Sequence, residues 1–582
     1  MNMTTLLSND SAVARPWVKC FAAGVPANIE VPYMSIYGLI AQTAKKYPAY
    51  TAIDYMGRRF TYSQFIEAVD ECAQSLLSYG IRPGDSVTLS LPNVPNALML
   101  FYALNKISAR VCMTHPLSSP KELEHYVTQT NSRWAVTLDL FYDRFAEMLH
   151  QGKIERLVIA HISDYLPFKK KAGFRVTKGR KIGRVPEHPY IIPWKTFFSH
   201  GQNCGTKAVA PEPDPHSGSV VLFSGGTTEL PKGILLTSYN FNALAVQTQA
   251  ITGLIPKDSV LAILPVFHGF GLGLCIHTCL CIGGMSILVP EFSTKTYISS
   301  LIKHEPTVLA GVPTLFEALM RDENFKKVSF TRLKGAYSGG DSLYPGIKQR
   351  FDHMIKSQGS KVELKEGYGL TETVTACAIS PDVYRENSMG VPIPNMLAKI
   401  VKPDTEQEQP CGVEGEICIA GPTIMKEYLN APEETKKTLR EHTDGFTWLH
   451  TGDLGCMDSD GYLYFKNRIK RILKVSGFSV YPMQVEQVLE SHPAVFKACV
   501  IGVPDDYQMT SVKAFVVLND KSTNQEAVRH ELIAHCHKNL IKWSVPRKIE
   551  FRDSLPTTLV GKVAYTRLEQ EELSKISSKE AS

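Results

Sequence analysis

Apolar side chains in the first part of the chain alternate between two spacings. Between residues 65 and 77 they recur at three- and four-residue intervals, as an amphipathic helix requires, and this run stops before Gly80. The turn sequence RPGD at residues 82–85 leads into SVTLSLP at residues 86–92, which is typical of a buried strand. Helical spacing then returns over residues 97–107. Helices and strands that alternate at these lengths predict βαβ units around a largely parallel sheet.

The C-terminal part of the chain carries a smaller pattern of its own. Two apolar runs, ACVIGV at residues 498–503 and KAFVVL at residues 513–518, predict strands, and residues 525–538 predict a helix. We therefore expect an α/β protein with a large N-terminal domain of layered sheets and helices at residues 1–470. A small, mobile α+β domain is expected at residues 471–582, joined to the first through the stretch around residues 468–474.

Residues 259–290 contain no Asp, Glu, Lys or Arg, and this length would suffice to span a bilayer. Pro265 and five glycines interrupt the run, however, and both residue types disfavour one long regular helix. We expect a buried strand, a glycine-lined pocket wall and a second element within a soluble core.

Charge is distributed unevenly along the chain. The chain has 63 Lys and Arg against 57 Asp and Glu, a formal net charge of +6. Residues 169–184 (KKKAGFRVTKGRKIGR) contain eight basic side chains and no acidic one, and without them the remainder has a net charge of −2. Three interpretations remain open: a solvated mobile loop, a patch for anionic lipid, and, less favoured, a nucleic-acid surface, for which no recognised motif is present. We expect no nucleic-acid partner.

The thirteen cysteines are odd in number and scattered, which argues for a reducing compartment and against a disulfide framework. The cluster CIHTCLC at residues 275–281 lacks a CxxC motif and has apolar neighbours, so buried thiols are favoured over a zinc site. The N-terminus has neither the charged start nor the apolar core of a secretory signal. We expect a cytoplasmic protein, with peripheral contact at the inner face of the membrane through residues 169–184.

Three short motifs, together with several basic residues that follow them, suggest nucleotide chemistry. The apolar run VVLF at residues 220–223 leads into SGGTTELPKG at residues 224–233, a loop whose backbone N–H groups, hydroxyls and lysine suit phosphate oxygens. EGYGLTE at residues 366–372 places the hydroxyl of Thr371 beside the carboxylate of Glu372, which suits phosphate and Mg²⁺. TGD at residues 451–453 offers a carboxylate for ribose, and Arg468, Lys470, Lys474 and Lys562 follow.

With these motifs in this order, the sequence resembles the adenylate-forming enzymes, and within them the acyl-CoA synthetase branch, close to bacterial long-chain fatty acid–CoA ligases. The resemblance runs from RPW at residues 15–17 to GKVAYTRL at residues 561–568. It also includes PVFHGFG (265–271), GVPTLFEAL (311–319), GEICIAGP (415–422), LHTGDLG (449–455) and SGFSVYP (476–482).

The resemblance implies a ligase that uses ATP, Mg²⁺ and coenzyme A to convert a carboxylic acid, of medium or long chain, first to acyl-AMP and then to acyl-CoA. It implies that Lys562 bridges the acid and the α-phosphate, that Thr371 contacts phosphate and that Glu372 is the metal ligand. It places Asp453 and Arg468 at the ribose, and a coenzyme A channel near Gly477. The remaining implied cofactor-binding residues are Ser224, Gly225, Gly226, Thr227, Thr228 and Lys232 at the phosphates, Gly339 and Gly340 at adenine and the acyl group, and Tyr368, Gly369 and Lys474.

His268 matches a residue at the mouth of the family's acyl pocket. The aspartate with which amino-acid-activating relatives bind a substrate amine is absent from PVFHGFG, so an acid without an α-amino group is favoured. The resemblance also implies that the small domain rotates between the two half-reactions about a hinge residue, which here is Arg471. Glu229 occupies a position in the phosphate loop where the family commonly has glycine.

Two alternatives remain open. The acyl group could pass to an acyl carrier protein instead of coenzyme A; since no carrier domain follows Lys562, that carrier would be a separate chain. Alternatively, Glu229 could mark a relative that binds nucleotide or acyl groups without catalysis. The sequence does not indicate the chain length of the acid or the oligomeric state.

Overall fold

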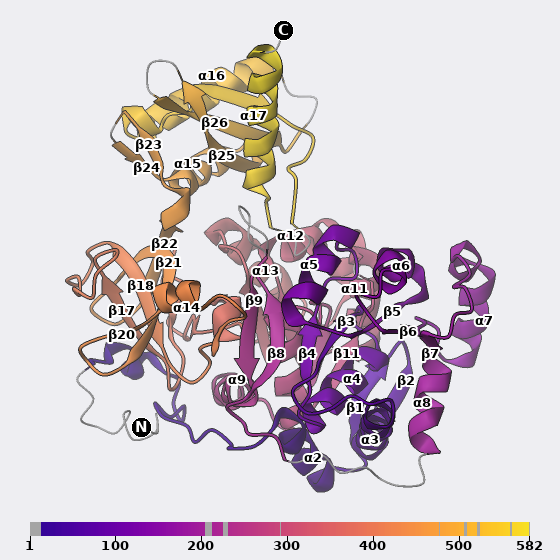
Figure 1. Cartoon of the computed structure of the whole chain (residues 1–582). Helices are drawn as coiled ribbons and strands as arrows, with labels where there is room; N and C mark the ends of the chain where they lie inside the picture. The colour runs from indigo at the N-terminus through magenta and orange to yellow at the C-terminus, as the bar shows by residue number, and fades with distance from the viewer. Residues whose placement is uncertain are drawn as a thin grey trace. The chain divides into compact units, whose positions relative to one another are not determined.

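The computed structural model describes residues 13–203, 212–224, 231–291, 293–476, 478–505, 509–520, 524–558 and 562–580. These residues form two compact units (Figure 1). The first unit is built from the chain up to Ser224 together with Pro231–Leu397 and Ala420–Leu449, and the second from Ala398–Ile419 and the chain from His450 onward. Each unit is described by itself below.

The first unit contains two large sheets. The nine-stranded sheet has the order β16-β15-β14-β13-β12-β10-β11-β1-β2, and the eight-stranded sheet has the order β19-β9-β8-β4-β3-β5-β6-β7. The strands of the first sheet are β1 Thr51–Tyr55, β2 Arg58–Thr61, β10 Ser259–Ala262, β11 Met285–Leu288, β12 Val308–Gly311, β13 Gly335–Gly339, β14 Leu364–Tyr368, β15 Ala378–Ile379 and β16 Val391–Pro392. Those of the second are β3 Ser86–Ser90, β4 Arg110–Met113, β5 Trp134–Leu138, β6 Arg156–Ala160, β7 Ile191–Pro193, β8 Gly218–Phe223, β9 Gly233–Thr237 and β19 Glu427–Tyr428.

Helices cover both faces of these sheets, as parallel strands require. Helix α4 is buried along nearly its whole length within the core that the two sheets share, which is expected of a helix between two apolar layers. Alternate residues of β5 and β6 face α5 and α6 instead, because side chains in a strand point to opposite faces.

The α-helices of this unit are α2 Ile36–Lys46, α3 Tyr62–Ser78, α4 Pro95–Lys106, α5 Pro120–Thr130, α6 Asp143–His150, α7 Phe168–Val176, α8 Trp194–Gln202, α9 Ser238–Thr252, α10 Cys279–Cys281, α11 Thr294–His304, α12 Pro313–Arg321, α13 Pro345–Ser357 and α14 Pro432–Thr438. Shorter helical turns are η1 Pro16–Cys20, η2 Asp139–Phe141, η3 Lys178–Lys181, η5 Glu323–Lys327 and η6 Thr371–Thr373, and η4 Phe270–Thr278 is a π-helix.

A five-stranded sheet has the order β17-β18-β21-β20, with β22 paired to β21. Its strands are β17 Leu397–Val401, β18 Gly415–Ala420, β20 Leu439–Glu441, β21 Thr447–Met457 and β22 Leu463–Arg468. The turn η7 Ile469–Arg471 and the hairpin β23 Leu473–Val475 and β24 Phe478–Val480 follow.

The C-terminal part of the second unit is a three-stranded sheet covered by helices on both faces. Helices α15 and α16 share an apolar core with one face of β25 and β26, and α17 packs on the other face through Leu568. The elements are α15 Pro482–Glu490, β25 Val495–Asp505, β26 Met509–Leu518, α16 Gln525–Asn539, η8 Lys542–Ser544, β27 Lys548–Phe551 and α17 Tyr565–Glu580.

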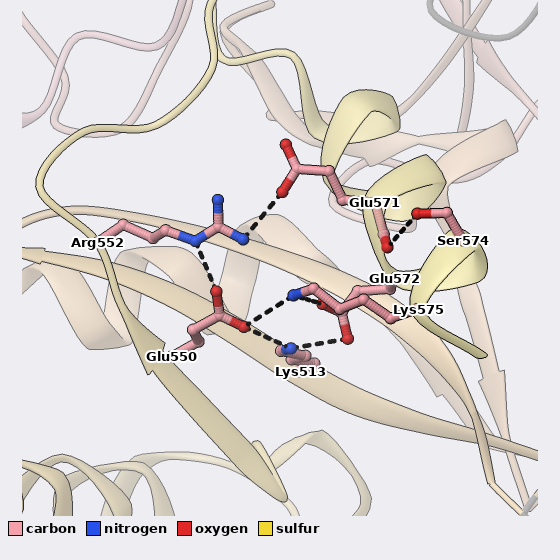
Figure 2. Close-up of polar contacts among 7 residues, drawn as sticks. All are labelled: Lys513, Glu550, Arg552, Glu571, Glu572, Ser574 and Lys575. Atoms are coloured by element: carbon pink, nitrogen blue, oxygen red, sulfur yellow. Dashed lines mark hydrogen bonds and ion pairs between the residues drawn. The ribbon is translucent and has the colours of Figure 1, made fainter. Parts of the chain in front are cut away.

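Ion pairs fix α17 against this sheet (Figure 2). The ammonium of Lys513, on β26, lies 2.7 Å from a carboxylate oxygen of Glu550 on β27 and 2.7 Å from one of Glu572 on α17. Arg552 contacts Glu550 at 2.6 Å and Glu571 at 2.9 Å. The helix that follows Lys562 in the chain is therefore held by charge as well as by apolar packing.

The elements predicted from sequence are confirmed. The predicted helices and strand of the N-terminal part correspond to α3, β3 and α4, with β3 and β4 parallel. The predicted C-terminal strands and helix lie within β25, β26 and α16. The uncharged stretch at residues 259–290 folds as β10, η4, α10 and β11, and it is mostly buried. Among the described helices, each is too short or too polar to cross a bilayer.

The structure also bears on the predictions for the basic segment and for the cysteine cluster. The basic segment is not an irregular loop, because its described backbone forms α7 and η3. In the CIHTCLC cluster, Cys275 and Cys279 are buried free thiols, and Cys281 is partly buried. This agrees with the prediction that these cysteines belong to the core.

Candidate active site

Three of the predicted motifs meet at one edge of the nine-stranded sheet. Strands β10, β12, β13 and β14 are parallel, so their carboxyl ends lie at the same edge. His268 follows β10, Gly339 ends β13 and is paired in register with Gly367, and Tyr368 ends β14. The topology thus gathers His268, Gly339, Gly340, Tyr368, Gly369, Thr371 and Glu372, which are scattered over more than a hundred residues of sequence, at the edge where α/β proteins bind ligands.

Two glycines allow the segments at this edge to touch. A Cβ atom at Gly369 would lie 1.4 Å from the carbonyl oxygen of Thr375, and one at Gly269 would lie 1.6 Å from that of Val374. Val374 itself has φ 62°, a left-handed backbone that a β-branched residue rarely adopts. The His268 segment and the turn after Glu372 are therefore pressed together backbone to backbone.

Asn93 holds the segment that leads to His268. Its buried side-chain amide donates hydrogen bonds to the carbonyl oxygens of Ala262 and Leu264, both at 2.9 Å, and accepts one from the N–H of Val266 at 2.9 Å. The sequence analysis did not single out Asn93. In the sequence, the sign of this role is an asparagine shortly after the predicted strand at residues 86–92. An amide that is buried there must find hydrogen-bond partners.

Glu372 is oriented by a residue that the sequence analysis also missed. The Tyr428 hydroxyl donates a hydrogen bond to Oε1 of Glu372 at 2.8 Å, and the N–H of Met425 donates to the Glu372 carbonyl oxygen at 2.7 Å. Burial, together with the Glu372 carboxylate, raises the pKa of Tyr428 well above its ordinary value, so the hydroxyl keeps its proton. A carboxylate oxygen held in this way suits Mg²⁺, which prefers hard oxygen ligands and takes few of them from the protein when phosphates supply the rest.

Lys232 extends this group of residues. Its ammonium lies 5.4 Å from the centre of the Tyr428 ring and 2.8 Å from Oε2 of Glu434. The backbone N–H of Ser224 donates to the Lys232 carbonyl oxygen at 3.1 Å, and the Lys232 N–H donates to Oγ of Ser224 at 3.3 Å. The two ends of the predicted phosphate loop are thus held together. Gly225, Gly226, Thr227, Thr228 and Glu229 lie outside the described residues.

Glu366 is a buried carboxyl group at the same edge. Its Oε1 accepts a hydrogen bond from the N–H of Leu343 at 3.0 Å, which fixes the loop that follows Gly340. Burial raises the pKa of Glu366 to about 8. A neutral carboxyl group therefore positions the backbone predicted to lie beside adenine and the acyl group.

In the second unit, Asp453 and Arg468 form an ion pair. They are directly opposite each other on β21 and β22, and Nε of Arg468 lies 2.8 Å from Oδ1 of the buried Asp453. The N–H of Asp453 donates to Oγ1 of Thr451 at 3.1 Å. The structure brings together the two residues predicted at the ribose.

Of the other predicted residues of this unit, Lys474 lies on strand β23 and Lys562 lies before α17. The Lys474 ammonium donates to Oγ of Ser479 at 2.7 Å between the paired strands β23 and β24. Gly477 lies outside the described residues. Lys562 is exposed, and its N–H donates to Oγ1 of Thr558 at 3.1 Å. The roles of Lys474, Gly477 and Lys562 in the reaction remain predictions.

Arg471, at the predicted hinge position, is held firmly within the second unit. Its guanidinium contacts both carboxylate oxygens of Glu486, donates to the Val500 carbonyl oxygen at 3.2 Å and stacks 4.6 Å from the centre of the Tyr565 ring. Burial alone would lower the pKa of Arg471, but the Glu486 carboxylate raises it above the ordinary value.

Comparison with known proteins identifies this arrangement. Residues 40–429 match the AMP-binding enzyme family, and residues 484–562 match the AMP-binding enzyme C-terminal domain. A long-chain-fatty-acid–CoA ligase of Bacillus subtilis (strain 168) is 32% identical over 96% of this chain and 98% of its own. A protein of the same name from Escherichia coli O6:H1 is 30% identical over 97% of this chain and 99% of its own.

Solved structures show the same fold. The anthranilate CoA ligase AuaEII, in complex with anthranoyl-AMP, superposes with a TM-score of 0.79 at 22% identity, over 94% of this chain and 98% of its own. ATP-bound MatB from Rhodopseudomonas palustris superposes with a TM-score of 0.79 at 24% identity, over 92% and 99%. With both of its domains matched and relatives aligned over nearly their full length, the chain belongs to the family of AMP-binding enzymes.

Proposed function

We propose that the acid this enzyme activates is a medium- or long-chain fatty acid. The enzyme is an AMP-forming acyl-CoA ligase that uses ATP, Mg²⁺ and coenzyme A. In the first step the carboxylate attacks the α-phosphorus of ATP, which forms acyl-AMP and releases pyrophosphate. In the second step the thiol of coenzyme A, as its thiolate, attacks the acyl carbon, which forms the thioester and releases AMP. The observation that carries the choice of acid is the near full-length similarity to two curated ligases named for long-chain fatty acids.

The physical difficulty of the first step is the approach of one anion to another. Positive charge and hydrogen-bond donors placed in advance are usually the largest contribution to overcoming it. We assign this role to Lys562 for the acid and the α-phosphate, and to Lys232 and Ser224 for the outer phosphates. When bound, Mg²⁺ supplies charge neutralisation on the polyphosphate, and Glu372, oriented by Tyr428, is the residue that would hold it.

The surroundings of His268 support an apolar acid. Its neighbours in the chain Val266, Phe270 and Leu272 are buried, and the N–H of Phe270 donates to Nδ1 of His268 at 3.2 Å. No carboxylate lies within residues 265–271, so a substrate ammonium would have no partner in this segment.

Product analysis tests the proposal. The purified protein, with ATP, Mg²⁺ and coenzyme A, is offered acids from acetate to oleate together with benzoate, and acyl-CoA, AMP and pyrophosphate are quantified. We expect all three products in equal amounts, with kcat/KM at least tenfold higher for oleate than for acetate or benzoate. A preference for acetate or benzoate would contradict the choice of acid.

Acyl-AMP that accumulates in the presence of coenzyme A, and is consumed only when an acyl carrier protein is added, would favour the carrier alternative. Nucleotide binding without pyrophosphate release would favour a non-catalytic relative.

We also propose that helix α7 attaches the enzyme to anionic membranes from the cytoplasm. Phe168 begins the helix with 87% of its surface exposed, and Val176 ends it with 59% exposed. Exposed apolar side chains among lysines are typical of surfaces that bind the lipid interface, where each cation contributes about 1 kcal/mol. Lys170 anchors the helix through a hydrogen bond of 2.8 Å to the carbonyl oxygen of Met56.

Vesicle co-sedimentation tests this attachment. We expect binding to phosphatidylglycerol-rich vesicles that weakens with salt and falls at least tenfold when Lys169, Lys170, Lys171, Arg180 and Lys181 are changed to Gln. A control variant neutralises five exposed cations elsewhere: Lys326, Lys327, Lys356, Lys361 and Arg332. Equal loss in both variants, or no loss in the first, would reject α7 as the attachment site.

A further inference from the structure

A thiol, an imidazole and a carboxylate meet inside the second unit. Glu416 and Cys418 lie two residues apart on β18, so their side chains project from the same face of the strand. His450 lies on β21, the neighbouring strand in the sheet. All three residues are buried.

The three ligating atoms lie close together. Nδ1 of His450 is 2.8 Å from Oε2 of Glu416, and Sγ of Cys418 is 3.6 Å from the same nitrogen. One ligand atom from each residue lies within 4.8 Å of the others. Among the described residues, this is the group of His, Cys, Asp and Glu side chains whose spacing suits a shared metal ion.

We propose that Glu416, Cys418 and His450 form a binding site for a divalent transition metal, with Zn²⁺ as the preferred ion. Thiolate, imidazole and carboxylate are the ligands that zinc takes in proteins, and three protein ligands leave a fourth position open. The ligand set has the charge to match the ion, since one thiolate and one carboxylate neutralise Zn²⁺ while the imidazole is neutral. A neutral cluster costs far less to bury than an isolated charge.

Binding exchanges protons for the metal. Cys418 gives up its thiol proton to form the zinc–sulfur bond, and a neutral His450 shifts its proton to Nε2 so that Nδ1 can bind the ion. Glu416 exchanges its hydrogen bond with His450 for a bond to the metal. One proton per zinc ion is therefore released to solvent, and no electron is transferred.

The site adjoins the segment that carries Asp453. Oε1 of Glu416 accepts a hydrogen bond from the N–H of Gly452 at 3.0 Å, and Oγ1 of Thr451 donates to the Ile417 carbonyl oxygen at 2.7 Å. A metal ion that draws on Glu416 acts on the backbone immediately before Asp453. We therefore expect zinc at this site to change the affinity of the protein for ATP. The zinc ligands are separate from Glu372, the residue assigned to Mg²⁺.

The alternative is a hydrogen-bonded Glu–His pair with a thiol that happens to pack beside it. Cobalt separates the two, because Co²⁺ bound to a thiolate gives a charge-transfer band that a carboxylate–imidazole pair does not. The full-length protein is treated with chelator, titrated with Co²⁺ and then with Zn²⁺. The variants are Cys418→Ser and, as a matched control on β21 outside the cluster, Cys456→Ser.

We expect one equivalent of Co²⁺ to bind with release of one proton per ion and to produce the band in the wild type and in Cys456→Ser. Zn²⁺ then displaces Co²⁺ and removes the band without further proton release. In Cys418→Ser the band disappears and zinc binds at least tenfold more weakly. Absence of the band in the wild type, or its persistence in Cys418→Ser, would overturn the proposal. Should Cys418→Ser fail to fold, alkylation of wild-type Cys418 in mild denaturant decides: zinc slows it severalfold if the site exists, and leaves it unchanged otherwise.

Discussion

The two units hold their predicted functional residues by different physical means. In the first unit, His268, Tyr368 and Glu372 are placed by the ends of parallel strands and by backbone contacts that leave no room for a methyl group. In the second, Asp453 is placed by an ion pair with Arg468, and the neighbouring Arg471 by one with Glu486.

The two units therefore differ in the kind of perturbation that they resist. Packing of the first kind is insensitive to salt but fails when volume is added. Buried ion pairs fail when charge is removed, because deletion of one partner leaves an uncompensated charge in a poor solvent.

The largest effect is expected from Glu486→Gln. The substitution leaves the largely buried guanidinium of Arg471 without its carboxylate, and it should lower the free energy of unfolding of the second unit by about 3–5 kcal/mol. Denaturant unfolding followed by fluorescence measures it. Glu526→Gln is the control, because Glu526 is 68% exposed in its pair with Arg529 and should cost less than about 1 kcal/mol. Similar losses in the two variants would show that burial of the Arg471 pair is unimportant.

Next is Gly369→Ala, which places a methyl group 1.4 Å from a backbone oxygen in the first unit. We expect a loss of about 1–3 kcal/mol in unfolding free energy and a severe loss of ATP–pyrophosphate exchange, because the backbone must shift beside Glu372. At Gly367, two residues earlier, the nearest atom to an added Cβ lies at an ordinary 3.6 Å. If Gly367→Ala proved equally damaging, close backbone contact would not be the reason.

Glu366→Gln should change the pH dependence of stability while keeping the hydrogen bond from Leu343. The folded protein holds the pKa of Glu366 at about 8, against an ordinary 4.5. Between these values folding takes up a proton, so this contribution is complete below pH 4.5 and is lost as pH rises towards 8, at no more than about 1.4 kcal/mol per pH unit. Thermal unfolding from pH 5 to 8 should show a shallower decline in the variant, and an unchanged slope would refute the assignment.

The smallest effect concerns the pair of His161 and Asp139, which lines a cavity of about 290 Å³ beside α7. Nδ1 of His161 lies 2.6 Å from Oδ2 of Asp139, and this hydrogen bond raises the pKa of His161 above 6.5. The stabilisation is fully present below pH 6.5 and is lost as pH rises through the raised pKa. Asp139→Asn should lower the pKa of His161 as measured by NMR, whereas Asp143→Asn should not. An unchanged pKa of His161 in Asp139→Asn would show that the hydrogen bond with Asp139 does not raise this pKa.

The contrast between the units also explains what the sequence predicts. Helical and strand spacing correctly predicts α3, β3, α4 and α16. The burial of α3 follows this spacing, whereas α4 and β3 are buried on nearly all sides. The family resemblance names His268, Gly339, Tyr368 and Glu372, and the structure places them at or after the ends of parallel strands. Local patterns were thus sufficient for the framework, while the roles of these residues in the reaction remain predictions.

Partners that join distant strands could not be predicted in this way. Tyr428 reaches Glu372 across 56 residues of sequence, and Asn93 reaches Leu264 across 171. In the sequence, the CIHTCLC cluster at residues 275–281 was the group considered as a possible metal site. The group with suitable spacing instead comes from two strands, with Cys418 and His450 separated by 32 residues. These contacts depend on strand pairing, which no local motif records.

The most direct test of the account is the effect of Lys562→Ala on the two half-reactions measured separately. Removal of one preorganised charge typically costs about 10²–10³-fold in rate. We predict a loss of that size in ATP–pyrophosphate exchange with oleate, while thioester formation from supplied oleoyl-AMP and coenzyme A stays within about threefold of wild type. Equal loss of both half-reactions, or retention of both, would contradict the assignment of Lys562 to the activation of the acid.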